Sequence, residues 1–518
     1  MKMITQRQHK RVGLKAIFGS VLLFSLLLSG CVSHKKALER KEQLHYKKAY
    51  VSPKHEMRAA WIQTVYQGEY ARMSVEEMQQ DFLRKLDKLQ ELRFNAVFFQ
   101  IRPESDAWYQ SGLEPWSRFL TGTQGVAPTP QWDPMRFLIA ECHKRGMEFH
   151  AWINPYRAAA NASVPLGPEH PYFRHPEWFV RYDNQLLYNP ALASCRQHIC
   201  AVVDDIVSRY DVDAIHMDDY FYPYPKPGIP LNDEYFFRTD PRGFHNIGDW
   251  RRDNVNILIK ELSSTIRTRK PWVRLGISPF GIFRNKRTVK TGSETNGLQN
   301  YDDLYADILL WDREGWVDYI VPQIYWEMGH SAADYTELVY WWGKNIKHAH
   351  YYVGQDVKRT MNKQQLHPKL SMAAEVSKGN VMWPANEVLW NTGGVQDMLK
   401  REYYSNYALI PPYTNIADDA PKRIQGIKAL WTEQGYTLTW LPDESSEGLP
   451  SAPHYYVVYA FASGERVNIS NPEHIVAICQ NPYYILPYKD GKEKFTYVVT
   501  AVSRMHVEGK GLKIKVKL

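Results

Sequence analysis

Residues 57–413 alternate between short apolar segments and longer segments with helical spacing, and this alternation constrains the fold more than any other feature of the chain. Eight of the apolar segments have the length and composition of buried strands. They are residues 57–66, 95–103, 147–156, 213–223, 274–281, 317–326, 350–357 and 379–384. Eight β/α units of this kind predict an α/β fold, a (β/α)₈ TIM barrel with enlarged loops.

The alternative arrangement of the same units is a doubly wound open sheet. No glycine-rich G-x-G-x-x-G turn follows any of the eight segments, which weakens that alternative. A closed barrel requires alternate residues of each strand to face the helix layer and the barrel interior. The third segment meets this requirement, because Phe149 and Ala151 would face the helices and His150, Trp152 and Asn154 the interior. We therefore predict the barrel.

After residue 413 the helical spacing ends. Short alternating runs at residues 429–440, 454–461 and 495–503 are separated by turn signals. About 100 residues of this kind predict a β-sandwich. Trp440 followed by a tyrosine-rich strand resembles a fibronectin type III module, so we expect a second, all-β domain at residues 421–518.

The positive charge of the chain is concentrated at its start. The whole chain carries a formal net charge of +8, but residues 1–56 hold twelve Lys or Arg and three Glu, a net +9. Residues 57–518 are therefore almost neutral, at −1. A nearly neutral body gives no electrostatic basis for binding a phosphate backbone, so we expect no nucleic-acid partner.

Residues 1–30 have a basic start followed by a short apolar run, the pattern of a secretion signal. The sequence Leu-Ser-Gly-Cys at residues 28–31 resembles the bacterial lipobox, in which cleavage leaves Cys31 to carry acyl chains that anchor the protein to a membrane. The alternative is an ordinary signal peptide with a chance cysteine. Because Val32 and not Asp follows, the sorting rule for such lipoproteins predicts an outer-membrane anchor in a bacterium with two membranes. Residues 31–56 would be the lipidated tether.

The segment HMDDYFYP, residues 216–223, holds the strongest candidates for catalysis. Alternation points Asp218 into the barrel mouth and Asp219 away from it unless a bulge intervenes, so Asp218 is the first candidate for nucleophile or base and Asp219 for a supporting partner. Glycoside cleavage needs a second carboxyl group as acid. The same rim would provide it from Asp106 or Glu327, with Glu104 nearby. The structural alternative is that adjacent aspartates cap a helix or pair with an arginine.

Polar and aromatic residues near the predicted strand ends are candidates for binding a sugar. Aromatic residues make up 14% of the chain, more than a core needs, and their faces can stack on flat or ring-shaped ligands. The candidates for hydrogen bonding to hydroxyl or N-acetyl groups are Arg58, Arg102, Asn154, Arg157, His216, Ser278 and Gln323. The candidates for stacking are Trp108, Tyr156, Tyr222, Tyr325, Trp326 and Trp383. Each could instead belong to a core salt bridge or to packing.

No pattern in the sequence requires a metal or another cofactor. His216 and Asp218 lie two residues apart without a third ligand at a recognisable spacing. The cysteines after Cys31 form neither a disulfide framework nor a zinc pattern, and no G-x-S-x-G nucleophile turn is present. We expect a site without a metal or cofactor.

Six motifs occur in an order that resembles the glycosyl hydrolase-like family 10, a family of bacterial lipoproteins and secreted proteins. They are MRAAWIQTV, FFQIRPESDAWY, FHAWINPYR, IHMDDYFYP, GISPFGIFRN and PQIYW, within residues 57–413. The resemblance implies a TIM barrel, often followed by a fibronectin-like domain, and a glycosidase of the kind that cuts peptidoglycan strands stripped of their stem peptides. It places Asp218 and Asp219 in the fourth-strand motif, and Arg102 and Asp106 in the second-strand motif.

Three residues depart from the family pattern. Glu104 and Glu327 stand where small or neutral residues are expected, and Phe283 stands where a Trp is common. The catalytic candidacy of the two glutamates therefore belongs to this chain alone.

We expect a monomeric, lipid-anchored glycoside hydrolase of the cell envelope that cleaves peptide-free peptidoglycan strands. The sequence leaves retention or inversion at the anomeric carbon open, because it does not give the separation of the carboxyl groups. Two alternatives from other classes are a non-catalytic glycan-binding lipoprotein and an envelope scaffold whose domain at residues 421–518 binds a partner.

Overall fold

The computed structural model describes residues 50–518. The expected signal peptide at residues 1–30, the lipidation site Cys31 and most of the tether lie outside the described residues. Within residues 50–518, no helix combines the length and the apolar composition that a membrane span requires.

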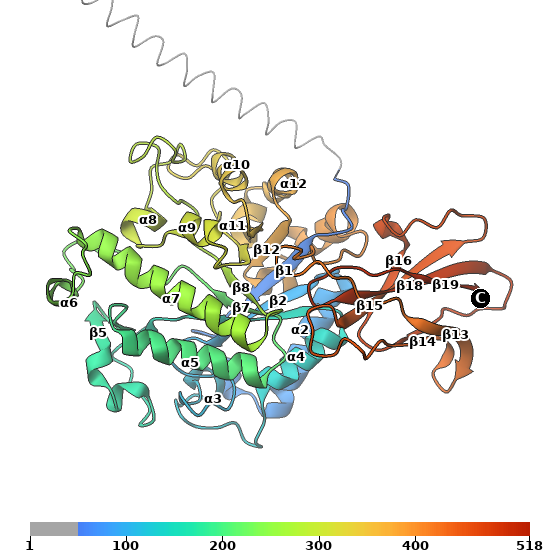
Figure 1. Ribbon diagram of the computed structural model, residues 1–518, viewed down its shortest axis with the longest axis horizontal. Coiled ribbons are helices and arrows are strands. Elements are labelled where there is room, and N and C mark those ends of the chain that lie inside the picture. Colours follow the sequence, from blue (N-terminus) through green and yellow to red (C-terminus); the bar gives the residue numbers. More distant parts are fainter. Residues whose placement is uncertain (1–49) are drawn as a thin grey trace, which may run out of the picture. The chain divides into compact units, whose positions relative to one another are not determined.

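Nine parallel strands form the central sheet of the described residues, in the order β10-β9-β8-β7-β3-β2-β1-β12-β11. Figure 1 labels β1, β2, β7, β8 and β12 among them. Their bounds are β1 Met57–Ile62, β2 Ala96–Arg102, β3 Glu148–Ile153, β7 Ala214–Met217, β8 Arg274–Ile277, β9 Tyr319–Ile320, β10 His350–Tyr351, β11 Val353–Asp356 and β12 Gly379–Trp383. Strands β10 and β11 are one segment interrupted at Tyr352; β10 pairs with β9, and β11 pairs with β12. This segment therefore closes the sheet into the predicted eight-segment barrel, and the open-sheet alternative is excluded.

Helices surround the barrel (Figure 1). They are α2 Val75–Glu91, α3 Arg118–Thr121, α4 Pro134–Lys144, α5 Ala193–Arg209, α6 Glu234–Thr239, α7 Ile247–Arg269, α8 Asn300–Asp303, α9 Ile308–Arg313, α10 Tyr335–Asn345, α11 Val357–Asn362, α12 Leu366–Val376, α13 Ala385–Leu389 and α14 Val395–Met398. Helix α2 shows how the sequence forms them: Ser74 and Glu77 cap its first turn reciprocally. Its buried residues recur at helical spacing and pack on the barrel.

Side chains alternate across the barrel wall as predicted. Phe149 and Ala151 pack in the helix-side core, whereas Trp152 packs in the interior core. The interior is filled around Tyr319, which lies against Gly276 of the neighbouring strand β8. A Cβ atom at Gly276 would lie 1.9 Å from the Tyr319 ring, so only glycine leaves room for this ring.

Two antiparallel sheets follow the barrel and confirm the predicted sandwich. One contains β13 Gln425–Thr432, β14 Gly435–Leu441 and β17 Tyr483–Ile485. The other contains β16 Ile475–Cys479, β15 Pro453–Ala462, β18 Lys494–Ser503 and β19 Leu512–Lys517. Trp440 is buried in the core that both sheets share. A further small sheet, β4 Arg157–Ala159, β6 Gln185–Tyr188 and β5 Phe179–Tyr182, is inserted after β3.

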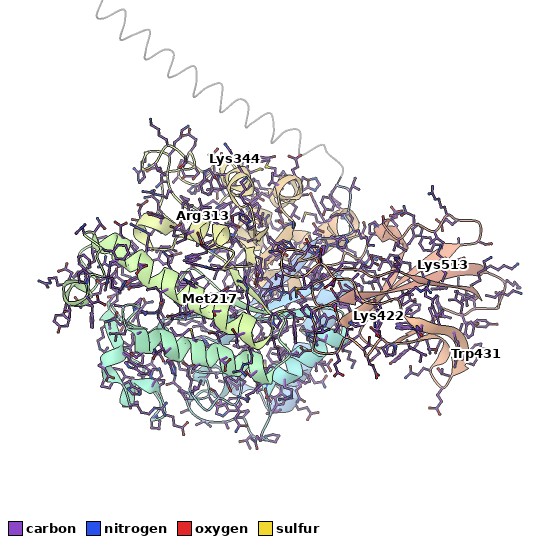
Figure 2. The ribbon with its side chains drawn as sticks, viewed as in Figure 1. Met217, Arg313, Lys344, Lys422, Trp431 and Lys513 are labelled. Atoms are coloured by element: carbon purple, nitrogen blue, oxygen red, sulfur yellow. The ribbon has the colours of Figure 1, made fainter. Side chains whose placement is uncertain are left out.

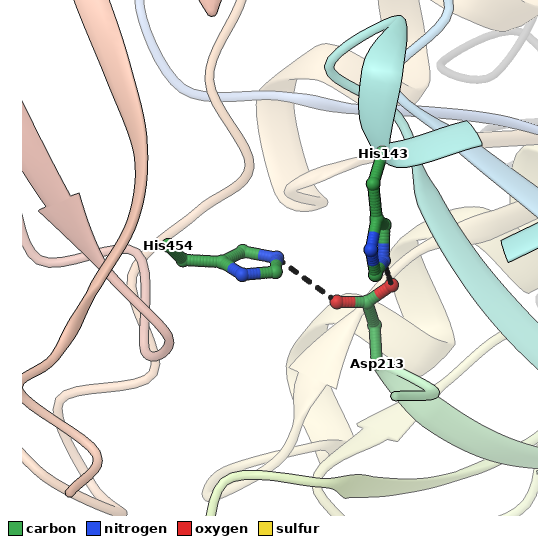
Figure 3. Close-up of side chains that lie close together, drawn as sticks. All are labelled: His143, Asp213 and His454. Atoms are coloured by element: carbon green, nitrogen blue, oxygen red, sulfur yellow. Dashed lines mark hydrogen bonds and ion pairs between the residues drawn. The ribbon is translucent and has the colours of Figure 1, made fainter. Parts of the chain in front are cut away.

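The sandwich contacts the amino-terminal ends of the barrel strands through buried ionic groups. Just before β7, one oxygen of Asp213 lies 2.8 Å from His143 Nε2 of α4 and the other lies 3.1 Å from His454 Nε2 of β15 (Figure 3). The backbone N–H of Phe149 also donates to Asp213, at 2.8 Å. This end of a TIM barrel serves stability, and here it holds the second domain.

We predict that Asp213→Ala lowers the free energy of unfolding by about 3–5 kcal/mol, because it leaves two buried imidazoles and a backbone N–H without their acceptor. Urea unfolding monitored by tryptophan fluorescence measures the loss. The control is Asp211→Ala, which removes a half-exposed carboxylate paired with Arg504 and should change stability by about 1 kcal/mol at most. Equal losses in the two variants would contradict the assignment.

Candidate active site

A cavity of about 290 Å³ opens at the carboxyl-terminal ends of the barrel strands. This rim is where TIM-barrel enzymes place their chemistry. Seven residues predicted from the sequence line it: Arg157, Asp218, Asp219, Ser278, Gln323, Tyr325 and Trp383. They come from segments far apart in the chain, which barrel closure brings together.

Asp218 is held by donors on three sides. Its Oδ2 accepts hydrogen bonds from Asn154 Nδ2 at 2.5 Å and from Trp152 Nε1 at 3.2 Å, and its Oδ1 accepts one from the Tyr220 N–H at 3.3 Å. Burial raises the pKa of Asp218, while Arg157 and these donors oppose the shift. The carboxylate is therefore fixed in orientation.

The support for Asp218 extends to β2 and to the loop after β1. Gln100 donates to Asn154 Oδ1 at 2.6 Å, and Gln100 Oε1 accepts from the backbone N–H groups of Thr64 and Val65, each at 2.9 Å. The side-chain amides of Gln100 and Asn154 each accept a hydrogen bond through the oxygen and donate one through the nitrogen to a different partner. The orientation of Asp218 is thus fixed by residues from three successive strands of the barrel.

Asp219 also lines the cavity, contrary to the expectation from strand alternation. Strand β7 ends at Met217 (labelled in Figure 2), so alternation no longer governs the two aspartates. The Tyr224 hydroxyl donates to Asp219 Oδ2. Burial and the neighbouring Asp218 raise the pKa of Asp219 to about 7, although hydrogen bonds from Tyr224 and Gln323 oppose the shift. A carboxyl group with this pKa can donate a proton near neutral pH.

His216 lies in the barrel interior and does not line the cavity. Its Nε2 accepts a hydrogen bond from Trp61 Nε1 at 3.1 Å and lies 3.1 Å from Ser278 Oγ, while its Nδ1 faces Tyr319 Oη at 3.2 Å. Burial holds the pKa of His216 well below its usual value, so the ring is neutral. Its role is to position Trp61 and Ser278, both of which line the cavity.

The other predicted acids do not line the cavity. Asp106 is fully buried and accepts hydrogen bonds from Gln124 and from the backbone of Glu104. Glu104 pairs with Arg118 at 2.5 Å. Glu327 pairs with Lys363 at 3.3 Å. The expectation that Asp106 or Glu327 faces Asp218 is therefore corrected by the structure.

Two predicted arginines are structural. Arg58 lies at the opposite end of the barrel and pairs with Glu56 at 2.7 Å. Arg102 is fully buried and forms a bidentate pair with Glu114, at 2.5 and 2.7 Å. Arg102 Nη1 also donates to the carbonyl oxygen of Asn154 at 2.5 Å, so it fixes the backbone that carries this amide.

Four predicted aromatic residues belong to packing. Trp108 is fully buried in the helix-side core. Tyr156 is buried in the helix-side core, and Tyr222 is buried there with its hydroxyl bonded to Asn254 at 3.0 Å. Trp326 packs edge-on against Phe280, with 5.2 Å between the ring centroids. Asn154, a predicted sugar-binding residue, does not line the cavity but donates a hydrogen bond to Asp218, which does.

Half of the residues that line the cavity are not among the candidates predicted from the sequence. They are Trp61, Gln63, Val65, Tyr66, Gln100, Trp152 and Tyr220. Gln100 and Trp152 occupy strand positions that alternation assigns to the barrel interior, so the sequence pattern could have identified them. Applied to the first strand, the same alternation would have selected Trp61 and Gln63.

Among residues 50–518, one group of three histidine or carboxylate side chains has the proximity that a metal ion requires. It consists of His143, Asp213 and His454, whose ligand atoms lie within 4.8 Å of one another (Figure 3). This group lies at the opposite end of the barrel from the cavity, where each imidazole contacts an oxygen of the Asp213 carboxylate. It has no place in the chemistry of Asp218 and Asp219.

We predict that Tyr224→Phe raises the pKa of Asp219 by about 1 to 2 pH units, because it removes a hydrogen bond to the charged form. ¹³C NMR titration of the aspartate carboxyl carbons measures the pKa. The control is Tyr222→Phe, whose lost hydroxyl bonds to Asn254 away from the carboxylates and should leave the titration unchanged. An unchanged Asp219 pKa in Tyr224→Phe would refute this role for the hydroxyl.

Comparisons with known proteins identify the family of the chain. The model of the family Glycosyl hydrolase-like 10 matches residues 56–371. Glycosyl hydrolase YngK of Bacillus subtilis is 38% identical over 479 residues, covering 88% of this chain and 92% of that protein. Glycosyl hydrolase DigH of Escherichia coli K12 is 37% identical over 311 residues, covering 56% and 70%. Among solved structures, the PgaB glycoside hydrolase domain of Bordetella bronchiseptica has a TM-score of 0.45 at 10% identity, covering 67% of this chain and 99% of that domain. The chain belongs to the glycosyl hydrolase-like 10 family.

Proposed function

We propose that this glycoside hydrolase cleaves peptidoglycan strands that have lost their stem peptides, with Asp219 as the proton donor. The observation that carries the proposal is the pair of buried carboxyl groups, Asp218 and Asp219, in a cavity lined by aromatic rings. Glycosidic cleavage requires an acid that protonates the leaving oxygen and a second carboxylate that supports the developing positive charge. The raised pKa of Asp219 and the fixed orientation of Asp218 suit these two roles.

The aromatic and polar residues of the cavity suit a sugar. Trp61, Trp152 and Trp383 offer ring faces and edges, and Gln323 and Ser278 offer hydrogen-bonding groups. Sugars combine apolar C–H faces with hydroxyl rims, so both kinds of contact contribute to binding. A mixed lining of this kind supports a carbohydrate ligand.

The charge of the lining supports a strand without peptides. Arg157 is the one basic side chain that lines the cavity among the described residues. Its Nε donates to the Pro103 carbonyl oxygen at 2.9 Å, which holds the guanidinium in place. Removing a stem peptide from peptidoglycan converts an amide into a free lactyl carboxylate, which an arginine binds well. Peptide-bearing strands lack that charge and are bulkier.

We propose that the enzyme works as a monomer in the cell envelope, held at the outer membrane by lipid on Cys31. The support is the lipobox-like sequence at residues 28–31 and the long charged stretch that follows it.

We predict that Asp219→Asn lowers the release of reducing ends from peptide-free glycan strands by about 10²–10⁴-fold, because the amide cannot donate the proton. Reducing-end assay and mass analysis of the products measure the loss, and circular dichroism verifies folding. Glu327→Gln is the matched control and should retain full activity, since Glu327 lies outside the cavity. Equal digestion of strands with and without stem peptides would overturn the proposed specificity.

The pH profile gives an independent check on Asp219. The acid must carry its proton in the free enzyme, so kcat/KM should fall as pH rises through about 7. A profile that stays flat from pH 6 to 9 would exclude Asp219 as the acid. Tyr224→Phe should move the alkaline limb to higher pH.

We predict that Cys31→Ser releases the protein from the membrane, because the thiol that accepts the first lipid is lost. Separation of inner and outer membranes, with labelling by an alkyne fatty acid, measures the change. The wild type should be labelled and lie in the outer-membrane fraction. An unlabelled wild type would contradict the lipidation.

A further inference from the structure

We propose that the nucleophile is the 2-acetamido group of the substrate itself, with Asp218 holding that group and Asp219 acting as the acid and then the base. The enzyme would therefore require an N-acetylated hexosamine on the non-reducing side of the cleaved bond and would retain its anomeric configuration. This inference rests on the proposed function for its glycosidase activity and names the chemical group that the site recognises.

The two carboxyl groups of the cavity lie side by side and not on opposite sides of it. In a two-carboxylate glycosidase the acid and the nucleophile or base flank the glycosidic bond, with about 5–9.5 Å between them. Asp218 and Asp219 are consecutive residues at the end of β7 and line the same wall of the cavity. The strand diametrically opposite β7 in the closed sheet is β12, and it presents Trp383. No other carboxylate of residues 50–518 lines this cavity.

The hydrogen bonds to Asp218 restrain its carboxylate. Asn154, Trp152 and the Tyr220 N–H together donate to both of its oxygens. Attack on an anomeric carbon would require an oxygen to leave these donors, so they make Asp218 a poor nucleophile. A fixed, hydrogen-bonded carboxylate is well suited to accept the N–H of an acetamido group and to stabilise the positive charge that the group acquires.

Three tryptophan rings lie beside Asp218. The rings of Trp61 and Trp152 each contact the ring of Trp383, with centroids 6.4 and 6.2 Å apart and interplanar angles of 72° and 73°. Trp152 also donates to Asp218, so the rings and the carboxylate adjoin. The two edge-to-face pairs share Trp383, and all three rings line the cavity, so they give it an apolar surface against which a methyl group can pack. An acetamido group has both parts: a methyl for the rings and an N–H for Asp218.

The chemistry balances without an external reagent. The acetamido oxygen forms a bond to C1, the bond from C1 to the leaving oxygen breaks, and Asp219 protonates that oxygen. The product is a cyclic oxazolinium ion whose N–H bonds to Asp218. A water molecule then gives a proton to Asp219 and forms a bond to C1, the ring C–O bond breaks, and the acetamido group is restored. One water is consumed, and two displacements at C1 retain its configuration.

The test uses a stable mimic of the oxazolinium ion and needs no turnover. The probe is N-acetylglucosamine fused at C1 and C2 into a bicyclic thiazoline, with N-acetylglucosamine as the reference ligand. Isothermal titration of the full chain should show the thiazoline binding at least about 100-fold more tightly than the reference. Asp218→Asn should lose most of that difference, while Glu327→Gln should keep it. Equal affinities for thiazoline and reference in the wild type would overturn the proposal.

A second measurement separates this inference from the substrate proposal. Peptide-free strands are compared before and after chemical N-deacetylation, and the anomer first released is identified by ¹H NMR. Cleavage at least about 10³-fold slower after deacetylation, with retention, supports the acetamido nucleophile. Equal rates, or inversion, would overturn it while leaving the glycosidase intact. If the strands are not cleaved at all but the thiazoline binds tightly, the peptidoglycan substrate is wrong and the acetamido site stands.

Discussion

Closure of the parallel sheet is the constraint on which the rest of this structure depends. One short segment, residues 350–356, pairs with β9 on one side and with β12 on the other. Closure brings the carboxyl-terminal ends of all the strands to one rim, so residues separated by more than 150 positions, such as Trp61 and Asp218, share a cavity. Closure also leaves an interior that must be filled, and Tyr319 fills it only because residue 276 is glycine.

The chemistry at the rim is supported from behind by a buried ion pair. Arg102 and Glu114 are fully buried and satisfy each other through two hydrogen bonds, and Arg102 also binds the backbone at Asn154. Replacing such a pair by apolar residues can leave stability unchanged, so its value lies more in the specific arrangement it imposes. Here it places the amide of Asn154, and that amide places Asp218. Arg102 is thus two contacts away from the carboxylate that it orients.

The sequence predicted what is periodic and missed what depends on loops and distant partners. Alternation identified the strands, the barrel and Asp218. It misplaced Asp219 because β7 ends at Met217, before the two aspartates. Strand β2 ends at Arg102, and Ser105 has a φ of 54°, which turns the chain out of the strand direction before Asp106. Strand alternation therefore does not predict which way Asp106 points. Arg102 could not be assigned from spacing alone, because its acidic partner Glu114 lies in the loop after β2. Arg58 was misplaced for a different reason: it stands at the start of β1, beside its partner Glu56 and at the end of the barrel away from the cavity.

The two ends of the barrel make opposite contributions to stability. A carboxyl group whose pKa is raised in the folded state lowers stability once the pH exceeds its unfolded pKa of about 4. Between about 4 and 7 the unfolded chain has released this proton, whereas the folded chain still holds it. Asp219 therefore destabilises the fold at the pH where a proton donor is useful. At the other end, attraction to His143 and hydrogen bonds from two histidines hold the pKa of Asp213 well below its usual value despite burial. The same contact raises the pKa of His143, so the pair stabilises the fold above the ordinary aspartate pKa and until His143 loses its proton. An active site that lowers the stability of the fold requires stabilising interactions elsewhere in the protein. The ionic contacts between barrel and sandwich provide stability of that kind, at the end of the barrel where they do not disturb the cavity.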